Sequence, residues 1–146
     1  VEMQEAVLNS GEYDIAIFVA AVGDWRVKSI STGKIKKIEG TKPPDLDLIE
    51  NPDILKAVCS LQNRPELIIG FAAETENVIE NAKKKMKKKG CDWVVANKVN
   101  KDTHNMGGDN NEIFFIKEEE VIHHKKSEKR EVAEIIREEI IKQFSD

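Results

Sequence analysis

The chain has 146 residues, of which 40% are hydrophobic and 34% charged, and this composition predicts one soluble folded domain rather than a disordered segment. Its 23 basic and 27 acidic residues give a net charge of -4, which argues against a protein that coats nucleic acid. No apolar run has the length needed to cross a membrane. Neither nucleic acid nor a membrane is therefore expected as a partner.

The hydrophobic pattern predicts strands that alternate with helices over most of the chain. The predicted elements, in order, are helix 2–9, strand 14–20, a long loop, a short strand near 45–49, helix 52–62, strand 66–72, helix 75–89, strand 91–96, a loop at 100–111, a hairpin of 111–117 with 120–126, and helix 129–144. Asn51-Pro52 is typical of a helix N-cap and its first turn, and Gly90 of a C-cap. The fold class is therefore α/β: a mostly parallel sheet with helices on both faces, followed by a C-terminal β-hairpin and helix.

Three predicted strands end in small or polar residues, at 20–24, at 70–75 and at Ala96-Asn97. Open parallel sheets bind ligands beyond the carboxyl ends of their strands. Any one of these ends could instead be a helix cap, as Glu74 or Thr75 would be for the helix that follows. Three such ends at one edge of a sheet favour a ligand site.

The lysine-rich helix 75–89 carries two lysines on its apolar side. At about 100° per residue, Lys85 and Lys89 share the azimuth of Val78, and the other lysines of the run point away: Lys83, Lys84, Lys87 and Lys88. The apolar stripe itself is predicted to contain Val78, Ile79, Ala82 and Met86. A lysine on the buried side must extend its ammonium group to solvent or meet an anion. Two stacked like charges favour a shared polyanion, although the helix C-terminus attracts cations without any ligand.

A basic tetrad, Lys34-Ile35-Lys36-Lys37, follows the first strand end after a polar segment. Its alternation could mark an exposed edge strand guarded by lysines. The functional interpretation is a mobile lysine that closes over developing phosphate charge. Strand, small-residue turn, polar loop and lysines together predict a site for an anionic ligand, in particular a nucleotide.

Several other classes of site lack their motifs. The chain contains neither a GxxxxGK[ST] phosphate loop nor a GxGxxG dinucleotide fingerprint. His123 and His124 point to opposite faces of a strand, and His104 has no ligand at metal spacing, so no metal-binding side chain is predicted. Cys59 and Cys91 are isolated from each other in sequence, which indicates reduced, buried thiols and a cytosolic setting.

With these residues assembled, the chain resembles the phosphopantothenate–cysteine ligase (phosphopantothenoylcysteine synthetase) domain of the coenzyme A pathway, commonly the C-terminal half of a bifunctional flavoprotein. The matching segments run in family order: AAVGDW (20–25), KIKK (34–37), ENPDIL (50–55), GFAAET (70–75), the lysine pair, VVANKV (94–99) and DNNEIFFI (109–116). They cover nearly the whole chain, and their combination is highly specific. The expected architecture is then a Rossmann-like three-layer fold forming a single domain over 1–146.

The resemblance implies a two-step ligase reaction in the cytoplasm. The carboxylate of 4'-phosphopantothenate attacks the α-phosphate of CTP, giving an acyl-cytidylate and pyrophosphate, and the amine of L-cysteine then displaces CMP. Mg²⁺ accompanies the triphosphate. The resemblance also implies a homodimer, with the hairpin around 111–126 as its candidate interface. In the full-length protein it implies an FMN-dependent decarboxylase domain.

The family's motifs assign roles to particular residues of this chain. Lys34 matches a catalytic lysine on a flexible loop that closes over the active site. The residues that match nucleotide contacts of the family lie in five segments: Ala20, Asp24, Lys34, Asn51, Pro52, Asp53, Ile54, Phe71, Lys85 and Lys89. The resemblance assigns no residue to cysteine recognition, and it does not distinguish CTP from ATP.

The chain also departs from the family pattern. Gly23, Trp25 and Val27 replace a more usual alanine, tyrosine and proline, which removes no chemistry. The family opens with a glycine-rich segment and a phosphate-binding turn, and this chain begins after both. We therefore expect a C-terminal portion of the ligase domain that does not complete the reaction alone. Three alternatives stay open: a non-catalytic nucleotide-binding and dimerisation fragment, a dinucleotide-binding oxidoreductase fragment, and nucleic-acid binding through the lysine helix.

Overall fold

The structure is a computed structural model that describes residues 1–31, 33–36, 40, 42, 45–99 and 110–145. Its elements, in chain order, are α1 (Glu2–Leu8), β1 (Ile15–Phe18), β2 (Trp25–Val27), β3 (Leu48–Glu50), α2 (Ile54–Cys59), β4 (Leu67–Glu74), α3 (Val78–Lys89), β5 (Trp93–Lys98), β6 (Asn110–Ile116), β7 (Val121–Glu128) and α4 (Lys129–Phe144). Most of the loop predicted at 100–111 lies outside the described residues.

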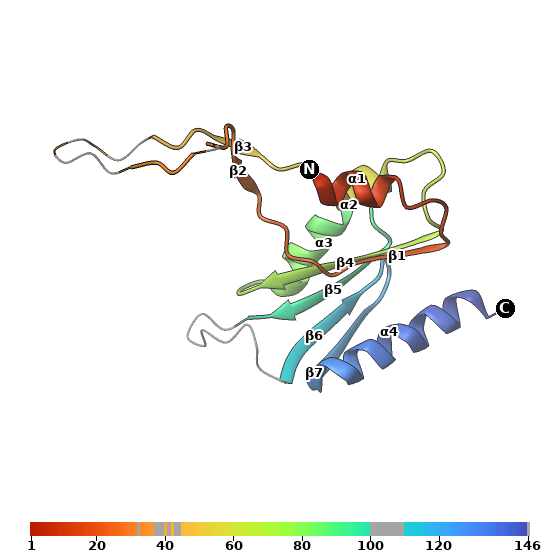
Figure 1. The fold of residues 1–146 in the computed structure, drawn as a ribbon. Coiled ribbons are helices and arrows are strands. Elements are labelled where there is room, and N and C mark those ends of the chain that lie inside the picture. The colour runs from red at the N-terminus through yellow and green to blue at the C-terminus, as the bar shows by residue number, and fades with distance from the viewer. Residues whose placement is uncertain (32, 37–39, 41, 43–44, 100–109, 146) are drawn as a thin grey trace.

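The main sheet has the strand order β1-β4-β5-β6-β7 (Figure 1). Neighbours β1, β4 and β5 are parallel, and β6 pairs antiparallel with both β5 and β7. Only β6 therefore runs against the other strands of this sheet. The predicted mostly parallel sheet with a C-terminal hairpin is confirmed.

Helices cover both faces of the main sheet. On one face, α2 and α3 pack over a buried cluster around Ile68 and Val94. On the other, α4 packs over a cluster around Ile69 and Val95 (Figure 1). Successive residues of a strand point to opposite faces, so coverage on both sides requires the continuous buried runs 67–70 and 93–96.

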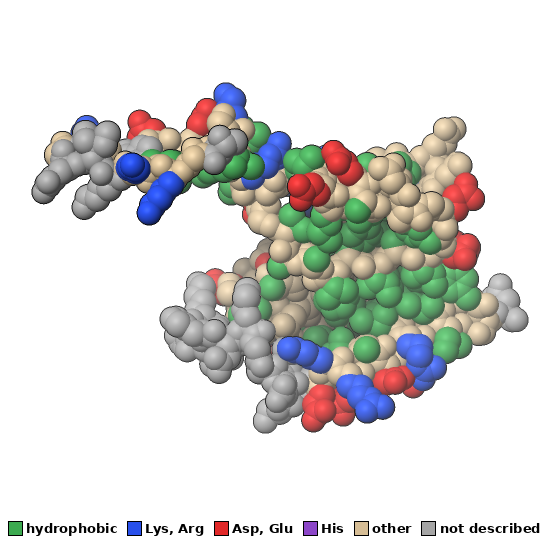
Figure 2. Space-filling model, viewed as in Figure 1, with side chains coloured by type: hydrophobic (Ala, Val, Ile, Leu, Met, Phe, Trp, Pro, Cys, Tyr) green, Lys and Arg blue, Asp and Glu red, His purple; other side chains and the backbone are tan. Residues whose placement is uncertain are grey.

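One part of the α4 face stays open. α4 contacts β6 and β7, whereas at the β1 edge Ile17 is 44% exposed and Val19, just beyond the strand, is 63% exposed. Figure 2 shows apolar side chains gathered over the sheet between α1 and α4. Both cysteines are free; Cys91 is buried, as expected, whereas Cys59 is only half-buried. Burial, with a smaller contribution from Cys59, raises the pKa of Cys91 to about 11.

Two helices begin later than the sequence predicted. The N-cap of α2 is Asp53, whose carboxylate accepts the backbone N–H of Lys56 at 3.1 Å, and not Asn51. Helix α3 starts at Val78 because β4 continues to Glu74 and the chain then turns through Asn77, which has a positive φ of 48°. Gly90 ends α3 with a φ of 78°, as predicted. None of the described helices is long and apolar enough to span a bilayer.

A second, two-stranded antiparallel sheet interrupts the predicted long loop. Trp25 pairs with Glu50 and Val27 with Leu48, and the described residues between the two strands project away from the main sheet (Figure 1). We call the described residues within 25–50 the arm. Lys34 and Lys36 lie outside any strand, so the edge-strand interpretation is wrong for them. Lys37 lies outside the described residues.

Candidate functional site

The turn that follows β1 is held by one residue on the far side of the arm. Asn51 donates three hydrogen bonds to consecutive carbonyl oxygens: from Nδ2 to Gly23 at 2.7 Å and to Trp25 at 3.2 Å, and from its backbone N–H to Asp24 at 2.8 Å. The Asp24 carboxylate is exposed and has no hydrogen-bond partner among the described residues. The structure thus brings two predicted site residues together, and Ala20 lies exposed at the start of the same turn.

Asp53 and Lys89 form a second pair of predicted site residues. Lys89 Nζ donates to Asp53 Oδ2 across α2 and α3. Burial tends to raise the pKa of Asp53, but the hydrogen bonds from Lys89 and from the Lys56 backbone, with the charges of both lysines, lower it overall. Both carboxylate oxygens of Asp53 are already bound by the protein. Because Asn51 and Asp53 are two residues apart, the backbone of 51–53 links the Asp24 turn to α3.

The two other residues of the 51–54 segment, Pro52 and Ile54, are at least partly buried. Pro52 is half-buried, and Ile54, the first residue of α2, is 7% exposed. The side chain of Ile54 therefore packs in the interior and supports the helix. The segment fixes the backbone that joins the Asp24 turn to Asp53.

Lys85 precedes Lys89 by one helical turn on α3, and both are half-buried. Lys84, Lys87 and Lys88 are exposed, so the predicted separation of the lysines is confirmed for these five. The prediction is wrong for Lys83, which is half-buried, and for Ile79, which is 39% exposed. The stripe that packs on the sheet is narrower than predicted: Val78, Ala82 and Met86. Lys85 has no ion-pair partner among the described residues.

Phe71 is separated from the lysine pair by the main sheet. Since strand residues alternate between faces, Phe71 points with Ile69 toward the α4 side. Lys85 and Lys89 lie on α3, which packs on the opposite face. The aromatic ring and the two ammonium groups therefore do not converge on one site in this chain.

Lys34 is also apart from the other predicted site residues. It is exposed on the arm, which projects away from the main sheet (Figure 1). No described hydrogen bond or ion pair joins Lys34 to the Asp24 turn, to Asp53 or to α3. The structure leaves this lysine in solvent.

Packing explains some of the small residues at the predicted second strand end. A Cβ at Gly70 would lie 3.0 Å from Leu55 Cδ2 and 3.6 Å from Cys91 Sγ, so the approach of α2 to the sheet favours glycine there, and a larger residue would have to displace the end of the Leu55 side chain. Ala72 is buried in the same cluster. A shallow hollow of about 400 Å³ lies farther along, lined by residues 75–80, Lys98 and Phe114. None of the predicted nucleotide-binding residues lines it.

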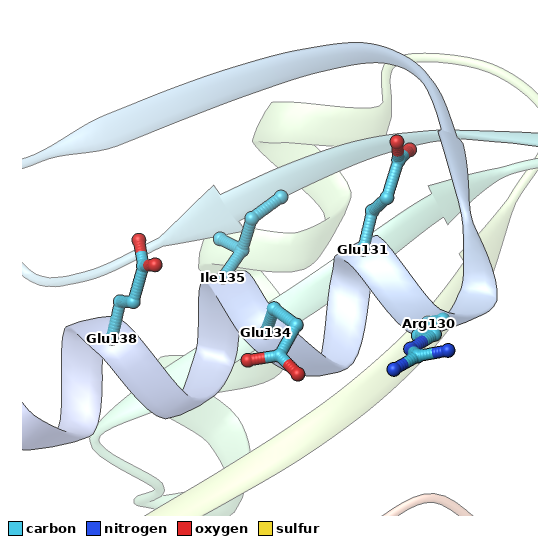
Figure 3. Close-up of a pocket in the computed structure, with 5 residues that line it drawn as sticks. All are labelled: Arg130, Glu131, Glu134, Ile135 and Glu138. Atoms are coloured by element: carbon cyan, nitrogen blue, oxygen red, sulfur yellow. The ribbon is translucent and has the colours of Figure 1, made fainter.

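A second shallow hollow, of about 380 Å³, runs along α4 (Figure 3). Two of the carboxylates that line this hollow stabilise α4 itself. Glu131 accepts the backbone N–H of Glu128 at 2.8 Å in a capping box, and Glu134 accepts from Arg137 Nε at 2.7 Å. This hollow is therefore explained by helix-stabilising contacts and holds no predicted site residue.

Of the two described histidines, His123 has local partners, whereas the buried Nε2 of His124 has no hydrogen-bond partner among the described residues. His123 Nε2 lies 2.9 Å from Glu112 Oε1, and the His123 ring stacks on Phe114 with centroids 4.3 Å apart. Within the described ranges, no group of three or more His, Cys, Asp and Glu side chains is placed to hold a metal ion. His104 lies outside those ranges.

Sequence reasoning missed Arg26, which supports Asn51. Its Nη1 atom donates to Asn51 Oδ1 at 3.3 Å and to the carbonyl of Glu50 at 2.6 Å. The available signal was the pair of short segments 25–27 and 48–50, each with β-branched or aromatic residues that favour strands. Reading them as paired strands would have placed Arg26 beside the 51–54 segment.

The comparisons with known proteins agree on one family. Residues 1–144 match the family described as DNA/pantothenate metabolism flavoprotein C-terminal domain. The coenzyme A biosynthesis bifunctional protein CoaBC of Escherichia coli (strain K12) is 32% identical over 146 residues, covering 97% of this chain and 36% of that protein. CoaBC of Mycobacterium bovis is 40% identical over 96 residues, covering 59% of this chain and 22% of that protein. The chain thus spans about a third of the E. coli protein.

Solved structures show the same fold. The crystal structure of the C-terminal domain of CoaBC has a TM-score of 0.74 at 30% identity and covers 99% of this chain and 62% of that chain. A Cab2 mutant in complex with phosphopantothenate-cysteine has a TM-score of 0.53 at 20% identity, covers 84% of this chain and 43% of that chain, and supports the fold alone. From the family match over nearly its whole length, the chain belongs to the family of DNA/pantothenate metabolism flavoprotein C-terminal domains.

Proposed function

We propose that the chain carries nucleotide-binding machinery of a ligase that joins 4'-phosphopantothenate to L-cysteine with CTP, in cytoplasmic coenzyme A biosynthesis. The observation that carries this proposal is that the hydrogen bonds of Asn51 to the Asp24 turn and the pair of Asp53 with Lys89 are linked by the short backbone segment 51–53. These are four of the residues that the resemblance assigns to the nucleotide. Support comes from the family match and from the 32% identity to the coenzyme A biosynthesis protein CoaBC of Escherichia coli.

In this proposal, the cationic and the anionic groups of the chain bind different parts of the nucleotide. The half-buried Lys85 ammonium, without an acidic partner among the described residues, binds phosphate oxygens. The exposed Asp24 carboxylate accepts hydrogen bonds from a hydroxyl or amino group of the nucleotide. Lys34 supplies positive charge where negative charge develops as pyrophosphate leaves.

The reaction proceeds in two displacements. A carboxylate oxygen of 4'-phosphopantothenate bonds to the α-phosphorus of CTP, and the bond from that phosphorus to pyrophosphate breaks. The amine nitrogen of L-cysteine then bonds to the acyl carbon and loses a proton, while CMP leaves. Because Lys34 stands on the arm and acts as pyrophosphate leaves, the first displacement needs the arm to approach a site. We propose a homodimer and, in the longer protein, a neighbouring FMN-dependent decarboxylase domain as the setting for this approach.

Mg²⁺ would enter with the triphosphate and neutralise part of its charge. This ion is usually held by one or two carboxylates together with substrate phosphates, and not by an all-protein cage. Because this proposal assigns Asp24 to a hydroxyl or amino group of the nucleotide, the substrate phosphates and water would supply the ligands of the ion. The chain's own part is to present Lys85 to the phosphates.

A second candidate function is a nucleotide-binding fragment without turnover. The separation of Lys34 from the other predicted site residues favours it, since the catalytic lysine is not at the site in this chain. The two candidates share their ligand and differ in whether CMP is released.

Calorimetric titration tests the shared part of both candidates. CTP, ATP, NAD and single-stranded DNA are titrated into the chain, into Lys85→Ala, and into Lys84→Ala as a matched control. Lys84 is exposed and pairs with Glu80 at 2.7 Å, so we expect no effect there, whereas Lys85→Ala weakens CTP binding about tenfold. If NAD or DNA binds best, or CTP does not bind, the proposal is wrong.

An assay of CMP release separates the two candidates. CTP, 4'-phosphopantothenate and L-cysteine are added together, with E. coli CoaBC as a positive control and Lys34→Gln as the inactive variant. CMP release that requires all three substrates and Lys34 supports the ligase. CTP binding without CMP release supports the binding fragment.

A further inference from the structure

All the hydrogen-bond donors of Asn51 are engaged within the protein. A primary amide carries two N–H groups and the backbone carries one. The two amide hydrogens go to the carbonyls of Gly23 and Trp25, and the backbone N–H goes to the carbonyl of Asp24. With all three donors engaged inside the protein, Asn51 has none left to offer a bound nucleotide.

Arg26 fixes the direction in which this amide faces. Its Nη1 atom donates to Asn51 Oδ1 at 3.3 Å, and it is itself held by the carbonyl of Glu50 at 2.6 Å. The oxygen of the amide must therefore face Arg26, which leaves the nitrogen facing the carbonyls of the turn. A guanidinium group donates and never accepts, so the opposite orientation of the amide would lose this bond.

The Asp24 turn has little other support. Residues 19–25 are all exposed, and a Cβ at Gly23 would meet only the carbonyl of Trp25, at 3.8 Å. Asn51 binds three adjacent carbonyls, which constrains the turn more strongly than a single hydrogen bond would. The backbone at 23–25 cannot rotate without breaking at least one of these three hydrogen bonds. The direction of the Asp24 side chain follows from the backbone that bears it.

We propose that Asn51, oriented by Arg26, is a positioning residue that fixes the turn presenting Asp24, and that it does not itself contact the nucleotide. This inference rests on the proposed function only in taking Asp24 as the group that meets the ligand. It differs from the family resemblance, which assigns Asn51 to nucleotide contact. The constraint exists before any ligand binds, so it can be measured in the free protein.

The two tryptophans of the chain allow that measurement by ¹⁹F NMR of protein labelled with 5-fluorotryptophan. Trp25 belongs to the turn, and Trp93 is 5% exposed in the core, so one resonance reports the turn and the other reports the global fold. In ligand-free Asn51→Ala we expect the Trp25 resonance to move toward its position in unfolded protein, with Trp93 unchanged. Arg26→Met should give a smaller shift of the same sign. Asp47→Asn is the matched control, because it weakens only the exposed pair of Lys28 with Asp47, 3.3 Å apart on the same arm.

Titration of CTP into the same variants completes the test. Asn51→Ala should raise the Kd for CTP about tenfold, Arg26→Met less, and Asp47→Asn not at all. A raised Kd with an unchanged Trp25 resonance in the free protein would make Asn51 a ligand contact and overturn the inference. A shifted Trp25 resonance with an unchanged Kd would also overturn it. If the unmodified chain binds no CTP, the proposed function fails, and the Trp25 resonance alone then decides whether Asn51 fixes the turn.

Discussion

The main sheet and the arm place their large apolar residues in opposite environments. Phe115 and Ile68 are fully buried between the sheet and its helices, whereas Ile30, Ile35 and Leu46 on the arm are 84%, 62% and 68% exposed. The sheet is covered on both faces. β2 and β3 make most of their contacts with each other.

Because of this difference, the parts of the candidate site are held in place by different interactions. Lys85 and Lys89 stand on a helix fixed by apolar burial, which is strong and not directional. A two-stranded ribbon is marginal alone in water, so the arm depends on the polar contacts of Asn51 and Arg26 at its root. The residue predicted to be catalytic, Lys34, lies on the part with the least burial.

The largest effect on stability should come from the core of the main sheet. Phe115 is fully buried and meets Trp93 edge to face, with ring centroids 5.3 Å apart. Phe115→Ala removes this packing and leaves a cavity, so we expect the free energy of unfolding to fall by about 3–5 kcal/mol. Urea denaturation followed by circular dichroism measures it. A loss below about 1 kcal/mol would show that the packing of α4 on the sheet does not depend on this side chain.

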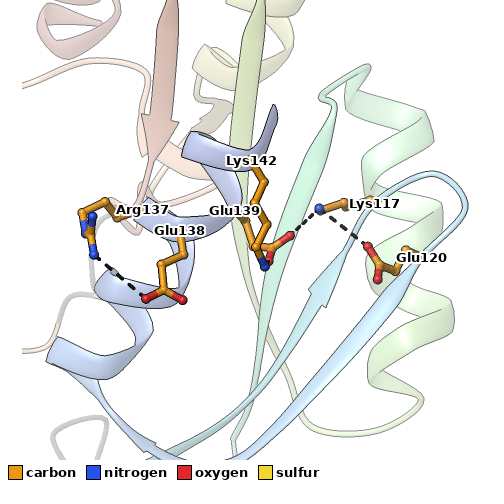
Figure 4. A network of polar contacts seen from close by, with 6 residues as sticks. All are labelled: Lys117, Glu120, Arg137, Glu138, Glu139 and Lys142. Atoms are coloured by element: carbon orange, nitrogen blue, oxygen red, sulfur yellow. Dashed lines mark hydrogen bonds and ion pairs between the residues drawn. The ribbon is translucent and has the colours of Figure 1, made fainter. Parts of the chain in front are cut away.

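A buried charge holds α4 to the same core. Glu139 is 8% exposed and accepts from Lys117 Nζ at 2.5 Å and from Lys142 Nζ at 2.6 Å (Figure 4). Lys117 also lies 3.6 Å from Glu120 and 4.9 Å from the centroid of the Trp93 ring. The hydrogen bonds from Lys117 and then Lys142 lower the pKa of Glu139 below its ordinary value, against the opposing effect of burial.

This lowered pKa makes the stability of the main sheet depend on pH. A carboxylate with a lower pKa in the folded state contributes stability above its unfolded pKa of 4.5, and the contribution is lost as the pH falls through the folded value. Glu139→Gln should lower the free energy of unfolding at pH 7 by about 1–3 kcal/mol and should flatten its fall below pH 4.5. The matched control is Glu134→Gln, whose pair with Arg137 is more than half exposed. Equal effects of the two substitutions would contradict the prediction.

The same contrast explains how much could be predicted from the sequence. The runs 67–70 and 93–96 are continuous and apolar, which is the pattern of strands buried on both faces, and both were placed correctly. β2 and β3 have three residues each, too few for a periodic signal. The sequence predicts a strand near 45–49, which overlaps β3, and none at β2, so it does not predict their pairing. Hydrophobic periodicity therefore locates the part of the molecule that burial stabilises and only one of the two short strands of the arm.

The candidate site shows a second limit of the sequence. The azimuth of Lys85 and Lys89 follows from helical geometry alone, and it was correct. The face of Phe71 could also have been derived, because it shares the parity of Ile69 along β4. The ion pair of Asp53 with Lys89 could not, since it depends on how α2 and α3 pack across 36 residues of chain.

A moderate effect is expected where α2 joins α3. Asp53 caps α2 through the N–H of Lys56 and also binds Lys89, so Asp53→Ala should cost about 1–2 kcal/mol. Asp53→Asn keeps an N-cap acceptor and loses only the charge of a partly exposed pair, so it should cost less than half as much. Urea denaturation of both variants at pH 7 measures the difference. If Asn costs as much as Ala, the pair with Lys89 outweighs the cap.

The smallest effects on stability should come from the arm. Ile30 is 84% exposed and Lys34 has no described partner at the site, so Ile30→Ser and Lys34→Gln should each change the free energy of unfolding by less than about 0.5 kcal/mol. Thermal and urea denaturation at low micromolar protein measure both. Under the proposed function, Lys34→Gln would nevertheless remove CMP release, which separates a catalytic residue from a structural one.

A larger loss in Ile30→Ser would mean that the arm is buried by something beyond this chain. Repeating the denaturation over a hundredfold range of protein concentration then identifies the cause, because stability supplied by a second copy rises with concentration whereas stability from within one chain does not. A concentration-dependent loss would move Ile30 and Lys34 from solvent into an interface between copies. It would also place Lys34, the predicted catalytic lysine, beside a partner's site. The arm, which is the least buried part of the monomer, would then be buried in the assembly.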